Sequence, residues 1–120
     1  MSKKTLVIGA SENPARYSNM AIKRLLQKGH EVKAIGARPG VVETVNIETG
    51  EPPISGIDTV TLYINPQRQA DYVTYILSLQ PKRIIFNPGT ENDDFEAIAK
   101  EKGIQTLEAC TLVMLGTGQY

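Results

Sequence analysis

The chain has 120 residues, with 13 basic and 13 acidic side chains and no net charge while its single histidine is neutral. This length is typical of one compact domain, and 41% apolar with 22% charged residues is the composition of a globular chain. The balanced charge gives no reason to expect nucleic-acid binding, which needs a basic surplus or a basic patch.

The single cysteine and the first apolar run indicate the cellular compartment in which we expect the protein. Cys110 has no partner for an internal disulfide, which favours a reducing environment. The apolar run after Lys4 stops at Ala10, so it is too short for a signal-peptide core or a membrane span. We therefore expect a soluble cytoplasmic protein with residues 1–120 as a single domain and no membrane partner.

Strand and helix patterns alternate along the chain. Apolar and β-branched runs predict strands at residues 5–9, 31–36, 59–64, 83–86 and 105–107. Apolar side chains at helical spacing predict helices at 18–28, from Asn65-Pro66 to just before Pro81, and from about Thr90 to Lys102. This alternation predicts an α/β fold with an open, mostly parallel sheet of about five strands and helices on both faces.

Polar residues fall at the expected helix starts. Ser18 and Asn65 are candidate N-caps, and Thr90 with Asp93 resembles a capping box. Acidic residues at helix starts interact favourably with the helix dipole, and the sequence offers four of them: Asp71, Asp93, Asp94 and Glu96. We interpret these carboxylates as structural and predict no metal site.

Two segments depart from the alternation. Residues 37–58 contain Pro39, Pro52 and Pro53 together with several glycines, so no full crossover helix fits there. Within them, residues 41–47 could form an edge strand or one arm of a hairpin. The tail, residues 111–120, is apolar; a final strand, a helical turn and a homodimer contact are all open for it.

The carboxyl ends of the predicted strands are the expected ligand site, because open parallel sheets bind ligands there. These ends are residues 9–11, 36–38, 65–66 and 87–90. Three of them lead into helix N-termini, whose free N–H groups suit phosphate. In the first loop, Gly9 lets the backbone approach a ligand, while Ser11, Ser18 and Arg16 offer donors to a diphosphate.

The first loop does not match the common nucleotide motifs. The dinucleotide fingerprint G-x-G-x-x-G needs two further glycines, whereas residues 9–14 read GASENP and no carboxylate follows the second strand. NAD and FAD are therefore disfavoured, although Arg38 could meet a ribose phosphate as in NADP binding. A Walker loop is also absent, because the sequence contains no G-K-[ST].

Motifs spread over nearly the whole chain add a resemblance. They are residues 7–11 (VIGAS), 13–14 (NP), 16–18 (RYS), 29–32 (GHEV), 56–60 (GIDTV) and 84–89 (IIFNPG). These motifs are similar to those of the small CoA-binding domain proteins, single-domain relatives of the N-terminal domain of the succinyl-CoA synthetase alpha subunit. The resemblance implies a Rossmann-like fold whose first loop holds the CoA diphosphate. Many relatives carry Asn-Pro and a lysine after the second strand, where this chain has Arg38.

The resemblance and the strand ends together make coenzyme A, or an acyl-CoA, the expected ligand. The candidate cofactor-binding residues are Gly9, Ala10, Ser11, Arg16, Tyr17, Ser18, Gly36, Ala37, Arg38, Asn65, Asn87, Pro88 and Gly89.

No catalytic residue is predicted. His30 follows Gly29 at a helix-to-strand turn, at the edge opposite the expected site, and is expected to be a surface residue. Cys110 could be a small buried hydrophobic residue or a thiol able to form a mixed disulfide with CoA, and no histidine pairs with it. We expect a non-catalytic CoA-binding module. An NADP- or nucleotide-sugar-dependent enzyme, and an interaction protein with a vestigial pocket, are the alternatives; a homodimer or another protein partner is open.

Overall fold

One mixed sheet of seven strands forms the centre of the computed structural model, which describes residues 2–120. The strands are β1 (Thr5–Ile8), β2 (Val32–Ile35), β3 (Gly40–Val42), β4 (Val45–Glu48), β5 (Thr59–Leu62), β6 (Arg83–Phe86) and β7 (Gln105–Glu108). Their order across the sheet is β3-β4-β2-β1-β5-β6-β7. All neighbouring pairs are parallel except β3 and β4. The predicted α/β Rossmann-like fold is confirmed.

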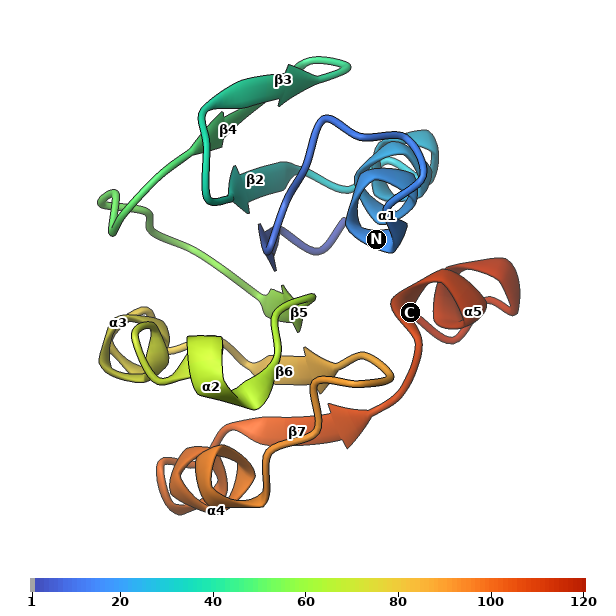
Figure 1. Ribbon diagram of the computed structural model, residues 1–120. Helices are drawn as coiled ribbons and strands as arrows, with labels where there is room; N and C mark the ends of the chain where they lie inside the picture. Colours follow the sequence, from blue (N-terminus) through green and yellow to red (C-terminus); the bar gives the residue numbers. More distant parts are fainter. Residues whose placement is uncertain (1) are drawn as a thin grey trace.

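Helices cover both faces of the sheet, as Figure 1 shows. The helices are α1 (Tyr17–Gln27), α2 (Pro66–Gln69), α3 (Val73–Ser78), α4 (Asp93–Glu101) and α5 (Thr111–Gly116). Helices α1 and α5 lie on one face, and α3 and α4 lie on the other (Figure 1). Within residues 2–120, no helix combines the length and the apolar character needed to cross a bilayer.

The core follows from the alternation of side chains along the central strands. In β1, Leu6 and Ile8 pack into the apolar cluster beneath α3 and α4, whereas Val7 packs into the cluster beneath α1. All residues of β1, β5 and β6 are buried, as expected for parallel strands covered on both faces. This explains why these strands appear in the sequence as short continuous apolar runs.

The single helix predicted between Pro66 and Pro81 is wrong, because it is divided into α2 and α3. The side chain of Gln69 is fully buried at the end of α2, where its Nε2 donates to the carbonyls of Ile64 (3.0 Å) and Thr90 (2.7 Å). These two bonds hold α2 close to the strand ends. Asn65 is confirmed as the N-cap of α2, since its Oδ1 accepts from the Arg68 N–H at 2.9 Å.

Two of the predicted N-caps are wrong. Helix α1 begins one residue before Ser18, and Ser18 is buried within its first turn. Helix α4 is capped by Asn92, whose Oδ1 accepts from the Phe95 N–H at 3.1 Å, and not by Thr90. The Thr90 hydroxyl instead donates to the Asn87 carbonyl at 2.8 Å, which closes the preceding turn.

The two segments that depart from the alternation complete the sheet and one of its faces. Strands β3 and β4 form an antiparallel hairpin beside β2, which brings the sheet to seven strands instead of about five. The tail forms α5, which contributes Leu115 to the core beneath α1. The helical alternative for the tail is therefore the one observed.

Candidate functional site

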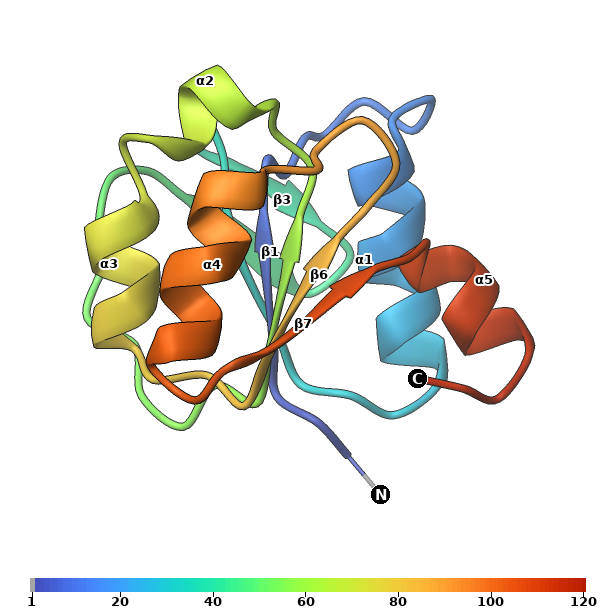
Figure 2. The same ribbon diagram turned by 90° about the horizontal axis from the view of Figure 1, so that it is seen from below.

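The carboxyl ends of the central strands meet at one edge of the sheet, where Figure 2 shows α2 and the loops after β1 and β6 together. A cavity of about 660 Å³ lies at this edge, a volume in the range of small-molecule sites. Most of the predicted site residues line it: Gly9, Ala10, Ser11, Arg16, Tyr17, Ser18, Ala37, Arg38 and Pro88. The other predicted residues, Gly36, Asn65, Asn87 and Gly89, are not part of the lining.

Two glycines allow the first two loops to pack tightly beneath the cavity. Gly9 has φ +97°, and a Cβ there would lie 3.0 Å from the Tyr63 carbonyl. A Cβ on Gly36 would lie 2.4 Å from the Ala10 carbonyl oxygen. Gly36 therefore supports the site through backbone packing although it does not line the cavity.

The loop between β1 and α1 is ordered by its own polar groups. The Ser11 Oγ accepts from the Asn13 N–H at 3.1 Å, and the Asn13 Oδ1 accepts from the Ala15 N–H at 3.0 Å. The loop is tied to α1 by Asn19, whose Nδ2 donates to the Ser11 carbonyl at 2.9 Å. Within residues 2–120 no side chain caps α1, and Tyr17 and Ser18 at its N-terminus line the cavity, so N–H groups without a side-chain acceptor lie at the cavity wall.

The charged residues of the lining are mostly basic. Arg16, Arg38 and Arg68 are all exposed and line the cavity, and the acidic residue among the lining residues is Glu12. The Glu12 carboxylate is engaged, because its Oε2 accepts from the Val41 N–H at 2.9 Å. The cavity therefore suits an anionic ligand, with guanidinium groups and a helix N-terminus as donors.

Sequence reasoning missed several lining residues. Arg68 belongs to α2, and the pattern of that segment indicated only a helix. Tyr63 and Ile64 come from a segment that was predicted only as a strand, and Ile47 comes from the possible edge strand or hairpin arm. Burial raises the pKa of Tyr63 to about 12, so its phenol stays protonated at neutral pH. The general signal that could have found them is their position at or just beyond a strand end.

Asn87 does not line the cavity, and its side chain forms hydrogen bonds within the protein instead. Its Nδ2 donates to the Thr61 Oγ1 (2.7 Å) and to the Leu62 carbonyl (2.9 Å). Its Oδ1 accepts from the Thr111 N–H at 2.8 Å. The side chain is buried and links the ends of β5 and β6 to the start of α5.

The two residues weighed for catalysis lie outside the cavity. His30 precedes β2 at the opposite edge of the sheet and is buried, so the expectation of a surface residue is wrong. Its Nδ1 accepts from the Lys3 N–H at 2.9 Å, and burial lowers its pKa. Cys110 is half-buried immediately before α5 and does not line the cavity.

A family assignment follows from the sequence as a whole. The model of the CoA binding domain family matches residues 3–116, which include every strand and every loop around the cavity. The chain belongs to this family. No curated protein matches the sequence.

Solved structures of similar proteins share the fold of this family member. An uncharacterized protein is 50% identical, with a TM-score of 0.97 over 100% of this chain and 99% of that one. A hypothetical protein from Pyrococcus horikoshii OT3 is 24% identical, with a TM-score of 0.87 over 97% of this chain and 83% of that one. The protein cell-free ID.343 from Thermus thermophilus is 20% identical, with a TM-score of 0.86 over 99% of this chain and 91% of that one.

Proposed function

We propose that this chain is a non-catalytic module that binds coenzyme A, or an acyl-CoA, in the cavity at the carboxyl ends of the strands. The observation that carries the proposal is a cavity with three arginines beside the uncapped N-terminus of α1, in a member of the CoA binding domain family. CoA carries a diphosphate and a separate 3′-phosphate, so it needs donors at more than one place.

The diphosphate is assigned to the first loop and the start of α1. The N–H groups at the start of a helix favour anions, and Arg16 at the N-cap position adds a guanidinium on the same side. The Ser11 hydroxyl accepts one hydrogen bond within the loop and keeps its own proton for a ligand.

The 3′-phosphate is assigned to Arg38. This residue follows β2, the position from which related folds contact the ribose of a nucleotide. A basic side chain at that position favours a ribose phosphate over a free hydroxyl. Its neighbours Ala37 and Pro39 present small side chains to the cavity, which leaves room for the adenosine.

The width of the site favours an elongated ligand. Its lining runs from the loop after β2, over β1 and β5, to the loop after β6. Three strand spacings of about 4.8 Å separate β2 from β6, so the site extends across roughly 14 Å of the sheet edge. An adenosine at Arg38 and a pantetheine directed toward Pro88 and Thr90 would fill this width.

The decisive experiment compares CoA with dephospho-CoA by isothermal titration calorimetry at fixed salt. We expect the wild type to bind CoA roughly tenfold or more tightly than dephospho-CoA, because a charge-assisted hydrogen bond contributes about 1.5–3 kcal/mol. Arg38→Ala should largely remove this preference. Arg24→Ala is the matched control, since Arg24 is exposed on α1 outside the cavity.

Other ligands in the same assay separate the alternatives. Acetyl-CoA should bind with an affinity similar to that of CoA, whereas NAD, NADP and ATP should bind more weakly. A preference for NADP would favour the enzyme hypothesis, and Arg38 would then be matched to a 2′-phosphate. Absence of binding to all of these ligands would favour an interaction protein and contradict the proposal.

A further inference from the structure

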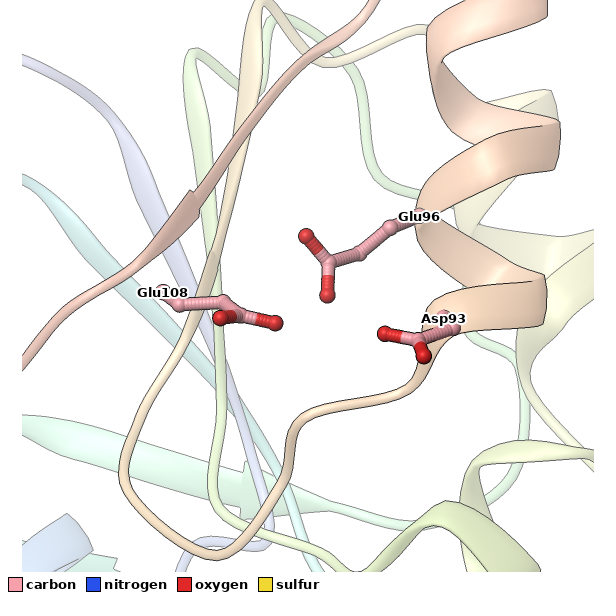
Figure 3. Close-up of side chains that lie close together, drawn as sticks. All are labelled: Asp93, Glu96 and Glu108. Carbon is pink, nitrogen blue, oxygen red and sulfur yellow. The ribbon is translucent and has the colours of Figure 1, made fainter.

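Three carboxylates converge at the edge of the sheet farthest from β3, outside the lining of the cavity (Figure 3). Asp93 and Glu96 are three residues apart in the first turn of α4, so they lie on the same side of the helix. Glu108 is the last residue of the edge strand β7. Each contributes a carboxylate oxygen, and these three oxygens lie within 4.8 Å of one another. Figure 3 shows the three side chains directed toward a common space.

Glu96 supplies a second observation, independent of this clustering. Its side chain is buried, with 8% of the residue exposed, and no N–H or O–H group in the described part of the chain donates to its Oε2. A buried carboxylate oxygen without a partner is costly, so a missing ligand is a natural explanation. Thr106, two residues before Glu108 and on the same face of β7, also has a buried hydroxyl without a partner.

The charges around the cluster do not neutralise it. Lys100 is the basic side chain that acts on Glu96, and it lies one turn farther along α4, exposed to solvent. The N-terminus of α4 contributes only about half a positive charge. Burial raises the pKa of Glu96 most; a hydrogen bond with the Glu108 carboxylate and then the charge of that carboxylate raise this pKa further.

We propose that Asp93, Glu96 and Glu108 bind a divalent cation that prefers oxygen ligands, of the class of Ca²⁺, Mn²⁺ and Mg²⁺. Carboxylate oxygens are the ligands of these ions, and opposite ligands of Ca²⁺ are about 4.6–5.2 Å apart. Three oxygens within 4.8 Å of one another are close enough to bind one Ca²⁺ ion together, and small rotamer changes would fit the smaller ions. Asp93 and Glu108 are exposed, so they can adjust their rotamers, and water completes the coordination shell.

A bound cation would join α4 to β7, between which the described residues form no salt bridge. The loop 87–92 leads directly into α4, and its residues Pro88 and Thr90 line the cavity. The proposal concerns the cation alone and does not depend on the ligand of that cavity.

The test uses the full chain, freed of metal with EDTA and dialysed, and titrated with CaCl₂, MnCl₂ or MgCl₂. We expect a saturable rise in the melting temperature of the wild type at concentrations of about 0.1–1 mM, as for weak calcium sites. Glu108→Gln should weaken the apparent affinity on the order of tenfold or more. Asp94→Asn is the matched control, because Asp94 lies in the same helical turn but outside the cluster, and it should leave the affinity unchanged.

Two further measurements make the result unambiguous. In EDTA, Glu108→Gln should be at least as stable as the wild type, because the substitution removes like-charge repulsion; its loss of binding is then not a loss of folding. Mn²⁺ should selectively broaden the amide resonances of residues 93–97 and 107–109. The proposal is overturned if no cation raises the melting temperature of the wild type. It is equally overturned if the cations act on Glu108→Gln as they do on the wild type.

Discussion

Arg16 is both the N-cap residue of α1 and a lining residue of the cavity. Its backbone is extended and forms the N-cap of α1, while its side chain makes no capping bond and lines the cavity. The side chain is exposed, so its removal leaves no buried group unpaired. A functional role of Arg16 can therefore be separated from a structural one.

Arg16→Ala should weaken CoA binding by roughly tenfold or more, since a hydrogen bond to a charged group contributes about 1.5–3 kcal/mol. The free energy of unfolding should stay within about 0.5 kcal/mol of the wild type, as for most surface substitutions. Calorimetric titration with CoA and urea denaturation measure the two quantities. Unchanged affinity would show that Arg16 is a solvated side chain and that the diphosphate assignment is wrong.

His30 is the residue at which the structure predicts a dependence on pH. Its ring lies edge-on to Tyr120, with 4.9 Å between the ring centroids, and its Nδ1 accepts from the Lys3 N–H. Only the neutral ring can accept this bond, and burial, followed by the charge of Lys3, lowers the pKa of His30. The neutral form is thus the one that the fold stabilises.

The sign of the pH effect follows from this depressed pKa. A histidine in the unfolded chain binds a proton near pH 6.5, above the folded pKa, so the contribution of His30 is present above about pH 6.5 and is lost as the pH falls. His30→Asn keeps an acceptor and removes the titration. In urea denaturation at pH 7.5 to 5, the stability of the wild type relative to His30→Asn should decrease toward low pH. A constant difference over this range would refute the assignment.

At the scale of secondary-structure elements, Asn87 connects parts of the chain that do not follow one another. It lies just after β6, and its amide bonds the Thr61 side chain and the Leu62 carbonyl in the β5 region, together with the first residue of α5. Thr61 and Thr111 also share a hydrogen bond of 2.8 Å between their hydroxyls. This buried network sets where α5 begins relative to the sheet.

Asn87→Ala should lower the free energy of unfolding by roughly 2–4 kcal/mol, because it leaves several buried polar groups without partners. Asn65→Ala is the comparison, since Asn65 is an exposed N-cap of the short helix α2 and its loss should cost only about 1 kcal/mol. Chemical denaturation of both variants measures the difference. Equal effects would show that the network around Asn87 contributes little.

At the scale of the whole molecule, the chemically reactive side chains are kept apart. His30 lies at the amino edge of the sheet, before β2, whereas the cavity lies at the carboxyl edge. Cys110 is at the carboxyl edge but outside the lining, and no histidine within residues 2–120 lies near it to act as a base. A nucleophile and its base are normally within hydrogen-bond reach of each other.

The purified protein should therefore show no acyl transfer with CoA and common acyl donors, with or without ATP. A spectrophotometric assay of free thiol over hours tests this, with Cys110→Ala as the comparison. Steady turnover by the wild type that disappears in Cys110→Ala would refute the prediction and assign a covalent role to the thiol.

The sequence by itself determined the fold class and most of the residues that line the candidate site. Local signals were sufficient because they depend on near neighbours: the apolar runs of β1, β5 and β6, the stripe of α1 and the glycine after β1. Alternating strands and helices favour a mostly parallel sheet, and the carboxyl ends of its parallel strands then lie at one edge. The loops containing Arg16 and Arg38 follow from that rule.

The tertiary structure alone decided which side chains meet across long sequence separations. Gln69 and Thr90 are 21 residues apart, and their contact helps to set where α2 ends. Glu108 joins Asp93 and Glu96 only because β7 returns beside α4. Arg68 reaches the cavity because α2 is held against the strand ends, and His30 is buried by residues from the two ends of the chain. No local pattern records such contacts, since each depends on the path of the whole backbone between its two partners.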